Sequence, residues 1–112
     1  MSQAWKIRLT QQAEADLLDI SMWTIENFGV QQAASYDETI VSAIEALMSG
    51  PNITGVRARH DIGLGIHTLH VARHRRKGRH FIIFRTGEGE IIEILRLLHD
   101  SRDLIRHLPD IT

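Results

Sequence analysis

The stretch Ile91-Ile92-Glu93-Ile94-Leu95-Arg96-Leu97-Leu98-His99-Asp100-Ser101-Arg102-Asp103 decides the fold of this chain. Its first part is so dense in branched apolar residues that we expect a strand buried on both faces. The pattern changes to polar residues at His99. Such a strand delivers Arg96, His99, Arg102 and Asp103 toward one end of a sheet, where binding and catalytic residues are often found.

Two segments before this stretch predict a three-stranded meander that ends with it. Residues from Ile66 to Arg73 alternate between apolar and polar, and residues from Arg79 to Thr86 contain four consecutive apolar residues, which is typical of a central strand. The basic turn from His74 to Gly78 joins the two, and we expect Gly78 to take a positive φ there. The third strand then runs from about Glu90 to Leu98.

The first half of the chain predicts one strand and two helices. Alternation from Trp5 to Leu9 indicates a strand, and Thr10 is a suitable cap for a helix from about Gln11 to Phe28. A second helix is expected from about Val30 to Ser49, with Gly29 as a left-handed cap between the two. Their apolar stripes comprise Ala13, Leu17, Leu18, Ile20, Met22, Thr24 and Ile25 in the first, and Ala33, Tyr36, Ile40, Val41, Ile44, Leu47 and Met48 in the second.

These elements predict an α+β domain of order β-α-α-β-β-β(-α) that spans residues 1–112. The helical hairpin would pack on one face of a small, mostly antiparallel sheet. A long irregular loop from Asn52 to Gly65 and a short last helix from Ser101 to Leu108 complete the chain. Little remains to cover the opposite face, so we expect that open face to receive a partner.

Composition excludes several classes of function. The sequence has no cysteine, which excludes disulfides, thiol catalysis and thiolate metal sites. No apolar run is long enough to cross a membrane, and the first residues lack a signal-peptide pattern. We therefore expect a cytoplasmic protein that makes no membrane contact.

Charge is distributed unevenly along the chain. Residues 1–50 carry two basic and seven acidic side chains, whereas residues 51–85 carry eight basic side chains and one acidic. Such a division suggests an acidic partner for the basic part, either nucleic acid or protein. The candidate contact residues are Arg57, Arg59, Arg73, Arg75, Arg76, Lys77, Arg79, His99 and Arg102.

Neither a metal nor a cofactor site is predicted. The seven histidines show no ligand spacing, and no glycine-rich phosphate loop is present. Metal-free RNA cleavage would need an acid, a base and cations, which His99, His80, Arg102 and Arg96 could supply. Strand alternation, however, puts His99 on the face of Leu95 and Leu97 and Arg96 on the opposite one, so we expect Arg96 to pair with a carboxylate instead.

Five segments carry a resemblance that covers nearly all of the chain. They are Leu9 to Ile20, Asn27 to Ala33, Gly50 to Ile53, His80 to Arg85 and Ile94 to Asp103. Each is unspecific alone, but their order and spacing together are specific. In these segments the chain resembles the ParE branch of the RelE/ParE toxins of bacterial type II toxin–antitoxin modules.

The resemblance implies a toxin that a ParD-like antitoxin, encoded beside it, neutralises by direct binding in a hetero-oligomer. ParE-like toxins are generally taken to inhibit DNA gyrase and block replication, which would make this protein an inhibitor and not an enzyme. The RelE-like branch instead cleaves mRNA on the ribosome, and this mRNA interferase activity is the alternative. A third reading is an inactive copy that mainly binds its antitoxin and, through it, operator DNA.

The resemblance also bears on individual residues. Arg96, His99 and Arg102 fall on the strand-end motif of the ParE-like branch, which is a family hallmark and not an established catalytic set. The turn from His74 to Arg79 is longer and more charged than is typical of that branch. This departure keeps RNA or ribosome contact open as an alternative.

Overall fold

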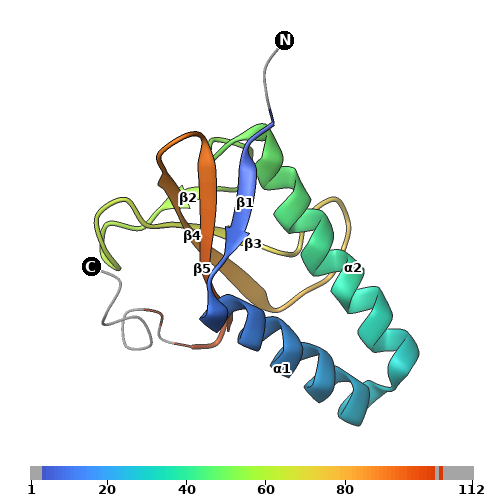
Figure 1. Cartoon of the computed structure of the whole chain (residues 1–112). Coiled ribbons are helices and arrows are strands. Elements are labelled where there is room, and N and C mark those ends of the chain that lie inside the picture. Colours follow the sequence, from blue (N-terminus) through green and yellow to red (C-terminus); the bar gives the residue numbers. More distant parts are fainter. Residues whose placement is uncertain (1–3, 103, 105–112) are drawn as a thin grey trace.

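A hairpin of two helices packs against one face of a five-stranded sheet (Figure 1). The computed structural model describes residues 4–102 and residue 104. The elements follow the order β1 (Lys6–Leu9), α1 (Gln11–Phe28), α2 (Val30–Ala46), the 3-10 turn η1 (Leu47–Ser49), β2 (Arg57–Ala58), β3 (His67–His70), β4 (His80–Gly87) and β5 (Ile91–His99). The predicted α+β architecture is confirmed. No helix in the described part of the chain is long and apolar enough to span a membrane.

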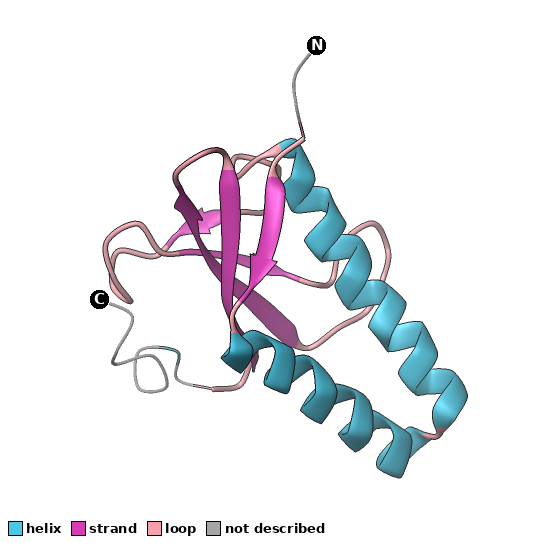
Figure 2. Cartoon of the chain, in the orientation of Figure 1, coloured by secondary structure: helices cyan, strands magenta, loops and turns pink. Residues whose placement is uncertain are grey.

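The sheet has the strand order β1-β5-β4-β3-β2. β1 pairs with β5 in parallel, and all other neighbours are antiparallel, so the sheet is mixed (Figure 2). The two segments whose density predicted central strands, β4 and β5, do lie inside the sheet. The sequence did not predict the short edge strand β2, which lies within the expected loop from Asn52 to Gly65.

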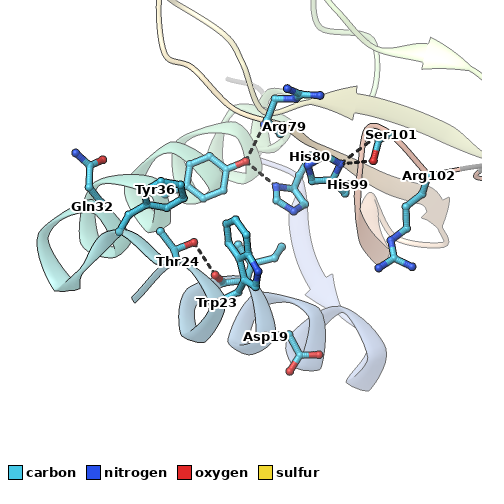
Figure 3. A pocket seen from close by; sticks show the side chains of 12 residues that line it. Asp19, Trp23, Thr24, Gln32, Tyr36, Arg79, His80, His99, Ser101 and Arg102 are labelled. Atoms are coloured by element: carbon cyan, nitrogen blue, oxygen red, sulfur yellow. Dashed lines mark hydrogen bonds between the residues drawn. The ribbon is translucent and has the colours of Figure 1, made fainter. Parts of the chain in front are cut away.

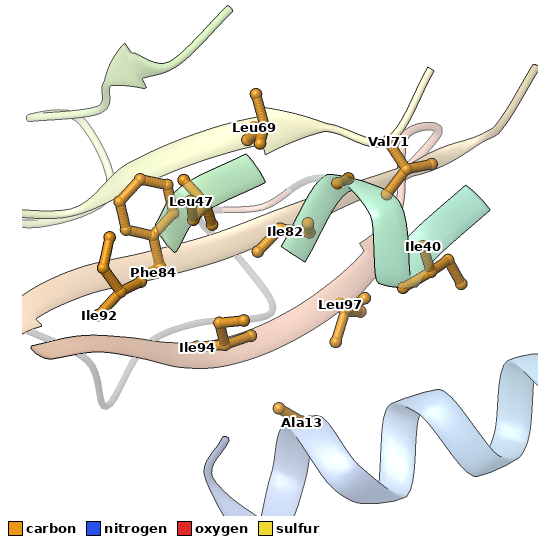
Figure 4. Close-up of a cluster of buried hydrophobic side chains, with 11 residues drawn as sticks. Ala13, Ile40, Leu47, Leu69, Val71, Ile82, Phe84, Ile92, Ile94 and Leu97 are labelled. Atoms are coloured by element: carbon orange, nitrogen blue, oxygen red, sulfur yellow. The ribbon is translucent and has the colours of Figure 1, made fainter. Parts of the chain in front are cut away.

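The main hydrophobic core fills the space between the helices and the sheet (Figure 4). Phe84 and Ile94 are fully buried there, in one cluster with Ile40 of α2 and Leu47 of η1. Part of the predicted α1 stripe, however, lies outside this core. The side chains of Leu18, Met22 and Ile25 are 62%, 51% and 42% exposed. The prediction of a wide buried stripe on α1 is therefore wrong for these three residues. They form an apolar surface that faces solvent.

A second cluster of apolar side chains covers the opposite face of the sheet, where an open surface was expected. It comprises Ile62, Ile66, Ile83, Leu95, Leu98 and Leu104, with Phe81 packed against it. Backbone hydrogen bonds close the loop on itself, because Ile62 N–H donates to the carbonyl of Arg59 and Arg59 N–H to that of Ile66, at 3.0 and 2.8 Å. Ile62 and Ile66 of this closed loop pack in the cluster. The prediction of an uncovered face is therefore wrong in this region.

One extra residue in β5 changes which side chains share a face. Ile94 pairs with Phe84 and Arg96 with Ile83, so Leu95 forms a β-bulge. After the bulge the alternation is reversed, and Leu97 joins Ile94 in the core beneath the helices. Strict alternation therefore assigned the wrong faces: His99 shares the face of Leu97 but not that of Leu95.

The first turns of α1 hold the bulge in place. The Thr10 hydroxyl donates to the carbonyl of Leu95 at 2.9 Å, and Leu97 N–H donates to the Asp16 carboxylate at 2.9 Å. A bulge leaves backbone groups without ladder partners, and buried groups of that kind need another partner. Thr10 also caps α1, since its side-chain oxygen accepts from Ala13 N–H at 3.1 Å.

Turn residues differ from expectation in two places. Gly29 takes a positive φ of 92°, but its ψ of 170° is extended, a conformation open essentially only to glycine. In the basic turn the positive φ values belong to His74 and Arg75, at 49° and 69°, and not to Gly78 as predicted. The predicted last helix contains Leu104, but most of it lies outside the described residues.

Candidate functional site

A pocket of about 720 Å³ opens between the helical hairpin and the end of the sheet where β4 begins and β5 ends (Figure 3). It combines aromatic, acidic and basic side chains from both helices and both strands. Its lining comprises Asp19, Ile20, Trp23, Thr24, Phe28, Gln32, Tyr36, Arg79, His80, His99, Ser101 and Arg102.

Two exposed aromatic rings of α1 form the apolar wall of this pocket. Trp23 is 57% exposed and Phe28 is 64% exposed, and their rings meet edge to face at 5.7 Å between centroids. Large aromatic side chains in water are costly unless a partner covers them. This wall is therefore suited to contact with another molecule.

Hydrogen bonds fix the protonation of His80 at the base of the pocket. The Tyr36 hydroxyl oxygen accepts from Arg79 N–H at 2.9 Å and lies 2.6 Å from Nδ1 of His80. Because the hydroxyl keeps its own proton, we assign Nδ1 as the acceptor of that proton. The ring must then carry its own proton on Nε2. Burial, and secondly the charge of His99, lower the pKa of His80 to about 4, so the ring is neutral at pH 7. Burial also raises the pKa of Tyr36, which keeps its proton.

His99 is held in the same tautomer by its own chain. The backbone N–H of Ser101 donates to Nδ1 of His99 at 3.1 Å, and the Ser101 hydroxyl lies 2.7 Å from the same nitrogen. Neutral His99 therefore carries its proton on Nε2. It is the cross-strand partner of His80, and the two rings meet edge to face at 5.2 Å.

An ion cluster beside the pocket positions Arg79. Its Nε lies 3.1 and 3.2 Å from the two carboxylate oxygens of Asp100. Nε2 of His70 donates to the same carboxylate at 3.0 Å, because Nδ1 of His70 already accepts from Ala72 N–H. The hydrogen bonds from His70 and Arg79 lower the pKa of Asp100, which stays ionised as their shared acceptor.

The structure brings together four of the residues that the sequence singled out: Arg79, His80, His99 and Arg102 all line the pocket. Arg96 does not, because Nε and Nη2 pair with the Asp16 carboxylate at 2.8 and 3.1 Å. This is the carboxylate pairing expected of Arg96.

The remaining basic candidates lie elsewhere on the surface. Arg57 is exposed on the edge strand β2, and Arg59 pairs with Asp61 at 2.7 Å. Four more lie in the basic turn or directly before it. Arg73 donates to the carbonyl of Thr54 and Arg76 to the hydroxyl of Thr39, and Arg75 and Lys77 are exposed. Their predicted role in partner binding stays a prediction.

Sequence reasoning missed the aromatic part of the site. Tyr36 was assigned to the core because it falls at helical spacing with Ile40, whereas Trp23 and Phe28 were not singled out. The sequence did contain a signal for them, because Trp23 and Phe28 are large aromatic residues of the first helix that fall outside its predicted apolar stripe. Among residues 4–102 and 104 no three histidine or acidic side chains are placed to hold a metal ion.

Acid should weaken the fold through His80. Its pKa is about 4 in the folded chain against an ordinary 6.5, so between these values the unfolded chain binds a proton that the folded chain does not. This contribution is fully present above pH 6.5 and is lost as the pH falls toward 4. Allowing for solvent screening, we expect a loss of about 1 kcal/mol between pH 7.5 and 5.0 in urea unfolding.

The control for this experiment is His80→Gln, which removes the titrating group. Its free energy of unfolding should depend less on pH over the same interval. Identical pH dependence in the variant and the parent would contradict the assignment. Asp100 does not interfere, because its pKa lies below the ordinary 3.8.

Comparisons with known proteins agree on one family. A family model described as the ParE toxin of the type II toxin–antitoxin system parDE matches residues 7–104. The chain is 33% identical over 103 residues to Toxin ParE1 of Caulobacter vibrioides, covering 90% of this chain and 95% of that protein. It is 34% identical over 101 residues to Toxin ParE1 of Mycobacterium tuberculosis, covering 89% and 94% of the two chains.

Solved structures agree with this fold. The chain superposes with a TM-score of 0.59 and 24% identity on a structure described as the chromosomal ParDE TA system from P. aeruginosa, covering 88% of this chain and 98% of the other. It superposes with a TM-score of 0.56 and 18% identity on a chain of the toxin–antitoxin complex RelBE2 from Mycobacterium tuberculosis, covering 91% and 98%. At these identities the two structures support the fold alone.

Proposed function

The chain belongs to the ParE toxin family of type II toxin–antitoxin systems, and we propose that it arrests growth by inhibiting DNA gyrase until a ParD-like antitoxin binds it. The observation that carries this proposal is the family match over residues 7–104. The toxin would act in the cytoplasm as a protein inhibitor without a cofactor. Contact with operator DNA would be indirect, through the antitoxin in a hetero-oligomer.

The exposed apolar surface of α1 supports binding of the antitoxin. Leu18, Met22 and Ile25 form an exposed line along this helix, and Trp23 and Phe28 continue it into the pocket. Exposed apolar patches of this kind mark protein interfaces, and aromatic residues with arginine supply much of the affinity at their centres. An amphipathic segment of the antitoxin could cover both the line and the pocket.

Gyrase inhibition is tested with purified components. Toxin added to gyrase and relaxed plasmid is expected to abolish supercoiling or to trap a cleavage complex, because the proposal makes gyrase the bound target. Adding the antitoxin from the neighbouring gene in equal amount should restore supercoiling. Unchanged supercoiling at toxin in clear excess, from protein that stops growth in cells, would rule out gyrase as the target.

The alternative, an mRNA interferase, has one observation in its favour. His80, His99, Arg79 and Arg102 converge on one pocket, which provides cations and ring N–H groups. Against it, Nδ1 of each histidine already accepts a hydrogen bond from within the chain, so neither neutral ring keeps a lone pair to act as a base. Toxicity and codon-positioned mRNA cuts that both vanish in His99→Ala and Arg102→Ala would favour the interferase.

A further inference from the structure

The polar side of the pocket consists largely of hydrogen-bond donors. His80 and His99 use Nδ1 as an acceptor within the chain, which leaves each with a proton on Nε2. Figure 3 shows the second ring nitrogen of His80 directed away from Tyr36 into the pocket. Arg102 adds a guanidinium that makes no ion pair with any described residue. Such a set fits a ligand that only accepts hydrogen bonds, and an anion best of all.

The rest of the lining limits which anion fits. Trp23 and Phe28 provide an apolar wall directly beside the donors, so the anion should be attached to apolar groups. Asp19 lines the α1 side of the same pocket and repels additional negative charge. A nucleic acid carries a phosphate at every step and would place several charges near Asp19 and the acidic first half of the chain. A single carboxylate between apolar residues fits this combination better.

We propose that this pocket binds one acidic side chain of the antitoxin, with its carboxylate on the donors of His80, His99 and Arg102 and its apolar neighbours on Trp23 and Phe28. This inference rests on the proposed function, because it requires an antitoxin that binds the toxin directly. It deepens that function by assigning the chemical group that the pocket recognises. The carboxylate would order Arg102 and close the pocket against water, which strengthens its hydrogen bonds.

The test is a double-mutant cycle on the complex with the antitoxin encoded by the neighbouring gene. In the toxin, His99→Leu removes the hydrogen-bond donor, whereas His99→Gln keeps a donor near the position of Nε2. In the same way, Arg102→Gln removes the positive charge, whereas Arg102→Lys keeps a cationic donor. In the antitoxin, each Asp or Glu is changed to its amide in turn. The control is Arg85→Gln, which removes a cation that pairs with Glu93 at 2.8 Å and does not line the pocket. Affinities are measured by titration calorimetry, with circular dichroism to verify folding.

We expect His99→Leu and Arg102→Gln each to weaken binding about 10- to 100-fold, since each removes a hydrogen bond to a charged group. His99→Gln and Arg102→Lys should lose much less, and Arg85→Gln almost nothing. One antitoxin carboxylate should show coupling of about tenfold to both toxin positions. Its amide variant should be almost insensitive to His99→Leu.

Other outcomes overturn the inference in distinguishable ways. If the antitoxin binds tightly but no carboxylate couples to His99 or Arg102, the pocket assignment is wrong while the proposed function stands. If the antitoxin does not bind at all, both fail. If a single-stranded oligonucleotide binds and His99→Leu abolishes that binding, the pocket recognises phosphate and the carboxylate assignment is overturned.

Discussion

Asp16→Ala is expected to destabilise the domain by about 3 kcal/mol, because it removes the acceptor of a largely buried arginine side chain. The Asp16 side chain is only 12% exposed and accepts two hydrogen bonds from the Arg96 guanidinium. It also accepts the backbone N–H of Leu97 at 2.9 Å. The variant would leave a largely buried guanidinium and a backbone N–H unpaired together. Urea unfolding followed by circular dichroism measures the loss.

The same variant should disturb the pocket as well as the stability. The bulge at Leu95 is what turns Leu97 and His99 toward the helices, and Asp16 with Thr10 holds that bulge. If the bulge relaxes, strict alternation would move His99 to the opposite face. Loss of the nuclear Overhauser contact between the His80 and His99 rings, in protein that is still folded at low temperature, would report this rearrangement.

An exposed ion pair on the same strand provides the control. Arg85 and Glu93 pair at 2.8 Å between β4 and β5, with the arginine side chain 49% exposed. Glu93→Gln should cost less than about 1 kcal/mol, because solvent screens exposed pairs. Equal losses in Glu93→Gln and Asp16→Ala would show that Asp16 contributes only as a surface charge.

Local pattern was enough to predict most of the fold. The apolar density of Phe81 to Phe84 placed β4 inside the sheet, and Gly29 separated the two expected helices, of which the second ends at Ala46 and continues as the 3-10 turn η1 to Ser49. The apolar run and the glycine each lie within, or directly beside, the strand or helices that they predict. The order of elements and the packing of the hairpin on one face follow from them with little further information.

The bulge could not be predicted in the same way. Its stability depends on Thr10 and Asp16, which lie 85 and 81 positions from their partners Leu95 and Leu97. Nothing in the order of apolar and polar residues along β5 marks Leu95 as the inserted residue. The wrong assignment of Leu95 and His99 to one face therefore comes from a long-range interaction that local alternation does not encode.

The candidate site shows the same division. Arg79, His80, His99 and Arg102 were accessible to sequence reasoning because charged and titratable residues at strand ends stand out. Tyr36 was not accessible in this way, since an aromatic residue at helical spacing is usually buried in the core. Its hydroxyl forms a hydrogen bond with His80, which lies 44 positions away in the sequence. What the tyrosine determines, the tautomer of His80, emerges only when the hydrogen bonds are known.

Gly78→Ala is expected to cost about 2 kcal/mol, because a Cβ at this position would lie 2.5 Å from Cγ2 of Val71. It would also lie 3.3 Å from the ring and hydroxyl of Tyr36. Val71 is 1% exposed and has no room to withdraw. The added methyl should therefore push the basic turn away from α2 and strain the hydrogen bond from Arg79 N–H to Tyr36. Urea unfolding measures the cost.

Two further variants separate packing from backbone strain at this glycine. Gly87→Ala is the matched control, because its φ is not positive and its nearest neighbour, Cβ of Ile91, would be at an ordinary 3.8 Å; we expect a change within about 0.5 kcal/mol. In a Val71→Ala background the added cost of Gly78→Ala should fall below about 1 kcal/mol, since the clashing methyl is gone. A left-handed backbone at Gly78, as the sequence suggested, would make the cost independent of Val71. Rescue by Val71→Ala thus identifies close approach, and not backbone freedom, as the reason that glycine is required beside Tyr36.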